Sequence, residues 1–330
     1  MSNMEATPVE VACVGEPTSG VEVIESREVP LGGLRAMMVR RTLPTRNRSM
    51  IGAWCFADHY GPEPVAESGG MRVLPHPHTG LATVSWLFEG EIEHIDSGGV
   101  HEMVLPGEMN LMSAGAGISH SEVSTPQADV LHGVQLWLAL PDHARHGDNG
   151  FQHYVPAAVN LTDPSGTAAG LIKVFVGELA GSAADIVTAT PLLGAEVLIE
   201  PNARVVLDVD PSFEHGALLD TPALSVNGVE LQRSSLGYVG PGASKLELVN
   251  PTGALARVIL LGGEPFEEDI VMWWNFIGRD HDEIVRFREE WQMRSERFGV
   301  VGGWESDEWI PAPPLPNTRL KPRKRPSTND

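Results

Sequence analysis

The feature that most constrains the fold of this chain is a succession of short apolar runs that end at glycine, proline, asparagine or aspartate. In the first half these runs include 81–88, 92–94, 102–105 and 134–140. Each has the length of a strand, several alternate apolar with polar residues, and turn signals such as 96–99 separate them. No helical period intervenes, so the pattern predicts an all-β barrel or sandwich.

A second region of the same kind begins at Leu171. Its predicted strands are 171–176, 195–199, 205–209, 236–239, 245–249 and 256–261. The two halves have similar size and strand chemistry, which favours a duplicated β-barrel. We therefore expect an N-terminal domain over residues 21–145, a linker over residues 146–170 and a C-terminal domain over residues 171–310. The 35 glycines and 26 prolines among 330 residues suit such a turn-rich protein.

Only one segment near the C-terminus has a clear helical period, and we predict a helix over residues 280–297. Its apolar face would carry Ile284, Phe287, Trp291 and the stem of Arg294, with Asp280 or Asp282 as the N-cap. Residues 1–20 are small and acidic, and residues 311–330 are rich in proline and then basic. Both ends are predicted to be disordered, the basic tail either as a solvated segment or in contact with an acidic surface.

Charge and cysteine content exclude several classes of function. The chain has 23 Lys and Arg against 44 Asp and Glu, a net charge of -21, which disfavours direct nucleic-acid binding by the acidic body. Its two cysteines favour a reducing, cytoplasmic compartment. The first residues lack the pattern of a signal peptide, and no apolar run approaches the ~20 residues that span a bilayer, so no membrane association is expected.

The chemistry of the chain is concentrated in two short pairs of metal-ligand residues. His76 and His78 are two positions apart, and so are His120 and Glu122. On a strand, positions i and i+2 point to the same face, so each pair can converge on one ion if the two strands meet inside a barrel. Three imidazoles and one carboxylate suit Fe, Cu, Ni or Zn and leave positions for a substrate oxygen and O₂.

Features beside these pairs have competing interpretations. Pro77 lies between the two histidines and indicates an edge strand or a bulge. The loop 115–117 resembles a phosphate-binding turn, but no helix or lysine follows it, so we interpret it as a tight turn that directs His120 inward. His59 either orients a ligand residue or stabilises a turn.

Other polar residues are interpreted as structural. His94 and His101 flank a predicted hairpin turn and are expected to be exposed. Gln135 and Trp137 share one face of the strand that also carries His132, where core packing is favoured over a role in lining a pocket. His215 stands beside Glu214 and is expected on a surface loop.

Three stretches of the first half resemble the pirin family, a branch of the bicupins. They are HPHTGLATVSWLFEGEIEHIDS, PGEMNLMSAGAGISHSE and LHGVQLWLALP. The resemblance runs from about residue 58 to residue 141 and continues weakly through the second half. It implies two tandem cupin (double-stranded β-helix, or jelly-roll) barrels, with one metal, usually iron, in the N-terminal barrel. No His-x-His pair occurs in the second half, so no metal is expected in the C-terminal barrel. The ligands that the resemblance implies are His76, His78, His120 and Glu122.

The chain departs from the usual family pattern directly after the first pair. Thr79, Leu81 and Ala82 stand where relatives usually have Arg, Phe and Glu. Many cupins take a carboxylate ligand from the position of Ala82, so Glu122 is the only carboxylate left in the motif.

The resemblance implies a mononuclear, Fe(II)-dependent dioxygenase of the quercetin 2,3-dioxygenase type, with Mn, Ni, Cu and Zn as other candidate metals. Its substrates would be a flavonol-like or other small phenolic molecule and O₂, and Glu122 would be the catalytic residue, as ligand or as base. The alternative is a non-enzymatic, redox-sensitive regulator that binds a protein partner, as a transcription cofactor or enzyme modulator. A purely structural metal is a third hypothesis.

Overall fold

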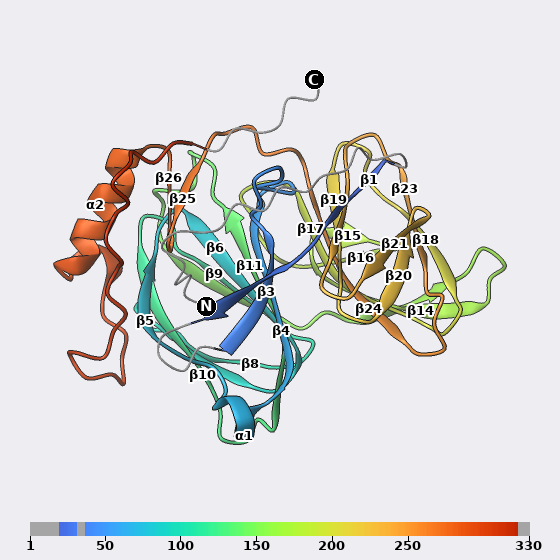
Figure 1. Cartoon of the computed structure of the whole chain (residues 1–330), viewed down its shortest axis with the longest axis horizontal. Coiled ribbons are helices and arrows are strands. Elements are labelled where there is room, and N and C mark those ends of the chain that lie inside the picture. The colour runs from blue at the N-terminus through green and yellow to red at the C-terminus, as the bar shows by residue number, and fades with distance from the viewer. Residues whose placement is uncertain (1–19, 32–36, 323–330) are drawn as a thin grey trace.

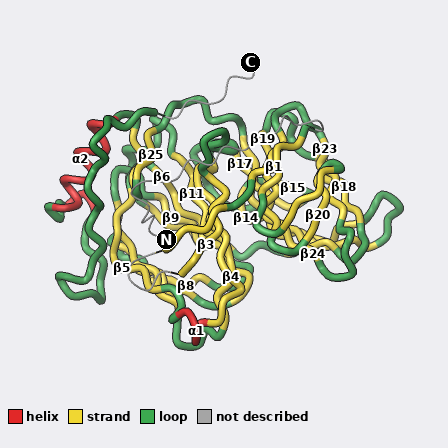
Figure 2. Tube along the Cα trace, viewed as in Figure 1, coloured by secondary structure: helices red, strands yellow, loops and turns green. Residues whose placement is uncertain are grey.

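The structure is a computed structural model that describes residues 20–31 and 37–322 and consists mainly of two β-barrels placed side by side (Figures 1 and 2). The disorder predicted for residues 1–19 and 323–330 concerns residues outside this described part. Within it, no helix combines the length and apolar character that a membrane span requires.

The first barrel consists of a seven-stranded and a four-stranded antiparallel sheet. The larger sheet has the order β12 (Gly150–Tyr154), β9 (Met109–Ser113), β6 (Leu81–Glu89), β11 (Val130–Ala139), β4 (Trp54–Pro64), β3 (Met37–Leu43) and β2 (Arg27–Leu31). The smaller sheet has the order β5 (Arg72–His78), β10 (Ile118–Ser124), β7 (Ile92–Asp96) and β8 (His101–Val104). A single helical turn, α1 (Val65–Ser68), follows β4.

The second barrel repeats this plan strand by strand. Its seven-stranded sheet has the order β1 (Val21–Ile24), β22 (Leu236–Val239), β19 (Glu214–Leu219), β24 (Ala256–Gly263), β17 (Leu192–Ile199), β14 (Ala168–Val176) and β13 (Ala158–Thr162). Its four-stranded sheet has the order β18 (Arg204–Asp208), β23 (Lys245–Val249), β20 (Ala223–Val226) and β21 (Val229–Gln232). A short hairpin, β15 (Glu178–Leu179) and β16 (Ser182–Ala183), is attached to this barrel. The expected duplicated β-barrel is therefore present.

Segments near the two ends of the described chain each join the barrel opposite to the one predicted from the sequence. We expected residues 21–24 in the first barrel. Instead, strand β1 pairs with β22 of the second barrel (Figure 1). Conversely, the hairpin β25 (Val271–Trp273) and β26 (Phe276–Gly278) packs on the first barrel and joins it through a bridge between Thr79 and Phe276. The two domains therefore exchange their terminal segments.

The segment expected to be a linker contains two strands. Strand β12 pairs with β9 of the first barrel, and β13 pairs with β14 of the second. The chain therefore passes from one barrel to the other between Tyr154 and Ala158. Local polarity suggested a loop here because both strands lie at sheet edges and half of their residues are exposed.

The C-terminal helix α2 (His281–Gln292) lies on the outside of the first barrel (Figure 1). Of the two candidate caps, Asp280 takes the role, because its side chain accepts a hydrogen bond from the Glu283 amide at 2.9 Å. Ile284, Phe287 and Trp291 are buried as the apolar spacing predicts. The helix ends before Arg294, whose φ of 54° is not helical.

The chain after α2 stays against the first barrel. It forms the short 3₁₀ helix η1 (Glu296–Phe298) and then returns along α2. The first part of the predicted tail lies here, since the backbone oxygen of Pro313 accepts a hydrogen bond from Arg288 at 2.7 Å and the Leu320 amide donates to His281 at 3.1 Å.

A continuous apolar core joins the two barrels where their larger sheets meet. Trp86 of the first barrel stacks on Phe175 of the second, with ring centroids 4.7 Å apart. The Trp54 indole donates to the backbone oxygens of Leu193 and Gly262, each at 3.1 Å. Because these side chains are fully buried, the interface fixes the two barrels relative to each other.

Candidate metal centre

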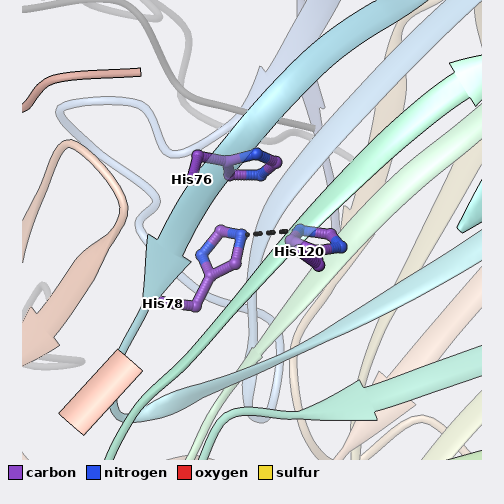
Figure 3. A group of neighbouring side chains, drawn as sticks. All are labelled: His76, His78 and His120. Atoms are coloured by element: carbon purple, nitrogen blue, oxygen red, sulfur yellow. Dashed lines mark hydrogen bonds between the residues drawn. The ribbon is translucent and has the colours of Figure 1, made fainter. Parts of the chain in front are cut away.

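The pairing of β5 with β10 brings the first three predicted ligands together. The register places His76 directly opposite His120, and His78 opposite Ile118. The Nε2 atoms of His78 and His120 are 3.1 Å apart, and the ring centroids of His76 and His120 are 4.4 Å apart (Figure 3). Strand β5 is the edge of its sheet, which agrees with the position predicted from Pro77.

Hydrogen bonds on the far side of two rings set their tautomers. The Nδ1–H of His76 donates to the backbone oxygen of Leu74 at 2.9 Å, and that of His78 donates to the oxygen of Asn275 at 3.3 Å. A neutral imidazole with a proton on Nδ1 has its lone pair on Nε2, which is the atom directed into the cluster. The C-terminal hairpin therefore orients one of the candidate ligands.

The three histidines have the properties of a metal site. Their side chains are fully buried, and burial lowers the pKa of each imidazole well below its usual value, so the rings are neutral and able to bind a metal. The Nε2 of His76 is buried without a hydrogen-bond partner in the described part of the chain. Such an orphaned nitrogen is rare in a folded protein and is the feature expected of a position that can bind a metal ion.

Glu122 lies at the same centre but in a different group of side chains. The register of β10 against β5 shifts between His120, which pairs with His76, and Glu122, which pairs with Val73, so β5 has one extra residue and is bulged there. Ligand atoms of His76, His78 and His120 lie within 4.8 Å of one another, whereas those of Glu122 lie within this distance of His120 and His94. The carboxylate also lies 3.4 Å from the hydroxyl of Ser85 on the opposite sheet. Glu122 is therefore joined to the cluster through His120.

His94 is a member of this centre that the sequence analysis missed. We expected it to be exposed, but it is 2 % exposed because β7 pairs with β10 and places it opposite Glu122. Its Nδ1 lies 3.3 Å from Nδ1 of His120, and its Nε2 lies 3.4 Å from Asp96. One assignment of the ring protons fits both contacts: His120 donates a hydrogen bond to His94, and His94 donates one to Asp96. The spacing of His94 and Asp96, two positions apart, was the signal available in the sequence.

The larger sheet contributes Gln135 and Trp137 to the wall facing the histidines. Trp137 stacks on Phe56, as expected for the core, but its other side contacts the edge of the His78 ring with centroids 5.2 Å apart. Gln135 accepts a hydrogen bond from Ser85 at 2.9 Å. The Nε2 of Gln135 and the Nε1 of Trp137 are buried without partners among the described residues. Both residues therefore line the centre as well as the core.

His59 and His132 lie at the contact between the barrels. The Nε2 atoms of both rings donate to one carboxylate oxygen of Asp220, at 2.8 and 2.6 Å, and the Ser234 hydroxyl lies 2.9 Å from Nδ1 of His59. Arg257 donates to the second oxygen of Asp220 at 3.1 Å. Because the carboxylate already has these three donors, we interpret the cluster as a hydrogen-bonded interface. His59 therefore takes part in the contact between the barrels, which the sequence analysis did not predict.

The remaining expectations have mixed outcomes. His101 is exposed, as predicted. The loop 115–117 is a turn whose amides are engaged, since the Ala116 amide donates to the oxygen of Gly147 at 2.9 Å. The prediction for His215 is wrong: it lies on β19 and is 1 % exposed. Local polarity suggested a loop, but β24 and β22 cover the strand on both sides.

The second barrel lacks an equivalent centre. The strands that correspond to β5 and β10 are β18 and β23, and their inward positions carry Val205, Leu207, Leu246 and Leu248. No group of three potential ligands lies wholly within this barrel among the residues that the structure describes.

Comparisons with known proteins agree with this architecture. The sequence pattern of the family described as Pirin matches residues 36–138, and that of the Pirin C-terminal cupin domain matches residues 194–299. A Pseudomonas aeruginosa protein whose name provisionally assigns it quercetin 2,3-dioxygenase activity is 40% identical, with 89% of this chain and 90% of that protein covered. A pirin-like protein of Caulobacter vibrioides is 31% identical over 88% of this chain and 98% of its own length.

A crystal structure described as quercetin 2,3-dioxygenase from Acinetobacter baumannii is 36% identical, with a TM-score of 0.85, and covers 92% of this chain and 98% of its own. The two barrels and the histidine cluster thus define a bicupin, a protein of two tandem cupin domains, with a candidate site for a divalent metal in the first. The chain belongs to the pirin family.

Proposed function

We propose that the protein is a mononuclear iron-dependent dioxygenase of the quercetin 2,3-dioxygenase type, acting on a flavonol-like or other phenolic substrate. The observation that carries this proposal is the orphaned, fully buried Nε2 of His76 beside the neutral rings of His78 and His120. Support comes from the names of the similar proteins in Pseudomonas aeruginosa and Acinetobacter baumannii. The metals Mn, Ni, Cu and Zn fit the same donors.

The residues of the chain would act in defined ways. His76, His78 and His120 would hold the ion, and Glu122 is the catalytic residue, either as a fourth ligand or as the base that takes the proton of a substrate hydroxyl. An iron ion would supply a Lewis-acidic, redox-active centre for a phenolic oxygen and O₂. Gln135 and Trp137 lie on the wall beside the histidines, and their unpartnered donors would hydrogen-bond the substrate.

The test is anaerobic loading with Fe(II), followed by quercetin and air. We expect wild-type protein to form the 2,3-cleavage product and His76→Ala to lose both iron and activity. His101→Ala is the matched control, because it removes an exposed histidine of the same barrel. Absence of product from wild type, or equal activity in His76→Ala, would refute the proposal.

One observation favours the alternative function, a redox-sensitive regulator that binds a protein partner. The four candidate ligands are each 0% exposed, which suits an ion that responds to electrons without admitting a substrate. A pull-down from lysate with ferrous and ferric protein tests this alternative. Different partners in the two states support it, and identical partners exclude the redox switch.

A further inference from the structure

The second barrel has a histidine, His215, on strand β19 of its larger sheet. In the first barrel, Ala82 on β6 pairs with Leu138, the second-last residue of β11. In the second barrel, His215 on the equivalent strand β19 pairs with Gly262, the second-last residue of β24. The two positions face different ways, because Ala82 packs in the core shared by the barrels, whereas His215 lies on the face of β19 that points into the second barrel.

The His215 side chain is buried and has no hydrogen-bond partner among the residues that the structure describes. It lies on the face of β19 that also carries the core residues Ala217 and Leu219 of the second barrel, and it is 1 % exposed. Neither of its ring nitrogens has a partner among the described residues. Burial lowers the pKa of His215 to about 4, so at neutral pH the ring has one N–H donor and one lone pair. A buried polar group without partners requires an explanation, such as a ligand.

A cavity in the second barrel has His215 among its lining residues. Its volume is about 770 Å³, which is within the range of sites for small molecules. The hairpin of β15 and β16 forms one wall, and the loop from Asp208 to Phe213 forms another. The rings of Phe213 and His215 lie 6.2 Å apart at 36°, and Leu179 and Leu192 add apolar surface. Such a wall suits an aromatic ring that carries a hydrogen-bonding group.

The charged residues around the cavity indicate which ligand charge it favours. Glu178, Asp208 and Asp210 line it, and none of its lining residues is a lysine or arginine. Lys245 lies 3.5 Å from Asp208 and offsets one of these carboxylates, which leaves the other two without that compensation. An anionic ligand is therefore disfavoured, and a cationic group near Glu178 is favoured.

We propose that the second barrel binds a small phenol with a cationic or uncharged side chain, whose hydroxyl pairs with the His215 imidazole. This site is separate from the histidine cluster of the first barrel, and the inference holds whether or not that cluster performs oxygenase chemistry. It assigns a ligand site to the cupin domain that lacks metal donors.

Three phenols of similar size but different charge test the proposal. These are tyramine (cationic), tyrosol (uncharged) and 3-(4-hydroxyphenyl)propionate (anionic), titrated into the full chain by calorimetry. We expect affinity to fall in that order. His215→Phe keeps a ring but removes both nitrogens, and it should weaken tyramine binding about tenfold. Glu178→Gln should reduce the preference for tyramine over tyrosol about two- to fivefold.

Controls separate this site from the first barrel. His101→Phe replaces an exposed histidine and should bind tyramine as wild type does, and so should His76→Ala. If His215→Phe does not fold, His215→Gln, which keeps a donor and an acceptor, should retain binding within a few fold. In wild type, tyramine should also shift the ring ¹⁵N signals of His215.

Any one of several results would overturn the inference. These are no binding of any of the three phenols, tightest binding of the anionic one, unchanged affinity in His215→Phe, and loss of binding in His76→Ala alone. An unchanged His215 ring signal at saturating tyramine would have the same meaning.

Discussion

At the scale of single residues, burial and partners decide what each histidine does. His101 is exposed and is available to solvent, whereas His76 is enclosed with an unpartnered nitrogen. His94 is also enclosed, but its two nitrogens lie near His120 and Asp96, so we assign it the role of positioning a ligand. Ligand histidines commonly donate their second N–H in this way, which fixes the ring and its tautomer.

The role of His94 leads to a prediction about metal affinity. His94→Leu keeps an apolar side chain of similar size but removes the acceptor for the His120 Nδ1–H, so we expect metal affinity to fall about 10- to 100-fold. The measurement is competition with a chelator for Fe(II) or Zn(II). His101→Leu is the control from the same barrel and should bind normally. Equal affinities in the two variants would show that His94 does not position His120.

At the scale of elements, strand pairing converts sequence spacing into a site. The i, i+2 spacing places His76 and His78 on one face of β5, but only the pairing of β5 with β10 brings His120 opposite His76. The bulge in β5 then places Glu122 opposite Val73 and away from the simple register. Helix α2 is defined more locally, by its apolar face and by the Asp280 cap.

The cap of α2 can be tested by substitution. Asp280→Ala removes the acceptor for the Glu283 amide and should lower the free energy of unfolding by about 1 kcal/mol, whereas Asp280→Asn keeps an acceptor and should cost little. Urea unfolding measures both. Equal losses in the two variants would indicate that the charge at Asp280 matters more than the hydrogen bond.

At the scale of the whole molecule, the two barrels depend on each other through exchanged ends and a shared core. The first barrel is completed by Phe276 and the rest of the C-terminal hairpin, and the second barrel by β1. Neither predicted domain is therefore complete within its own stretch of sequence. The Asp220 carboxylate adds a polar link, because it accepts hydrogen bonds from His59 and His132 of the other barrel.

The exchange predicts a long-range effect on the metal centre. Phe276 is fully buried, and Phe276→Ala should cost about 3–5 kcal/mol of stability. The substitution should also reduce metal retention, because the adjacent Asn275 oxygen orients His78. Phe213→Ala, at a partly exposed site of the second barrel, is expected to cost less and to leave metal content unchanged. Unfolding curves and elemental analysis provide both readouts, and normal metal content in Phe276→Ala would contradict the prediction.

The interface between the barrels predicts a dependence of stability on pH. Burial lowers the pKa of His59 to about 4, although hydrogen bonding to Asp220 opposes this; Arg40 and His132 also lower it. In the unfolded chain His59 binds a proton below about pH 6.5, whereas in the folded chain it does so only below about pH 4. Acidification between these two values therefore destabilises the fold.

From pH 7 to pH 5 this effect amounts to about 2 kcal/mol for His59. His59→Gln can still donate to Asp220 but does not titrate, so the variant should lose about 2 kcal/mol less than wild type over the same interval. Chemical unfolding at the two pH values measures the difference. Parallel losses in the two proteins would mean that His59 does not contribute.

Much of the site was predictable because it depends on local rules. Strand periodicity places His76 with His78 on one face, and the start and buried face of α2 follow from a cap and apolar spacing. His94 and His215 were misassigned for a common reason: a polar residue beside turn residues usually lies at the surface, and only the neighbouring strands show that these two do not.

By itself, the sequence determined the duplicated all-β architecture, the resemblance to the pirin family and the residue types that converge in the first barrel, since periodicity and spacing act over a few residues. Only the tertiary structure decided the exchange of the chain ends, the place of His94 behind His120 and the enclosure of His215 beside a cavity. These features depend on pairing between strands that are distant in the sequence. The stability of such a pair depends on the side chains and register of both strands, so it cannot be read from the sequence of either strand alone.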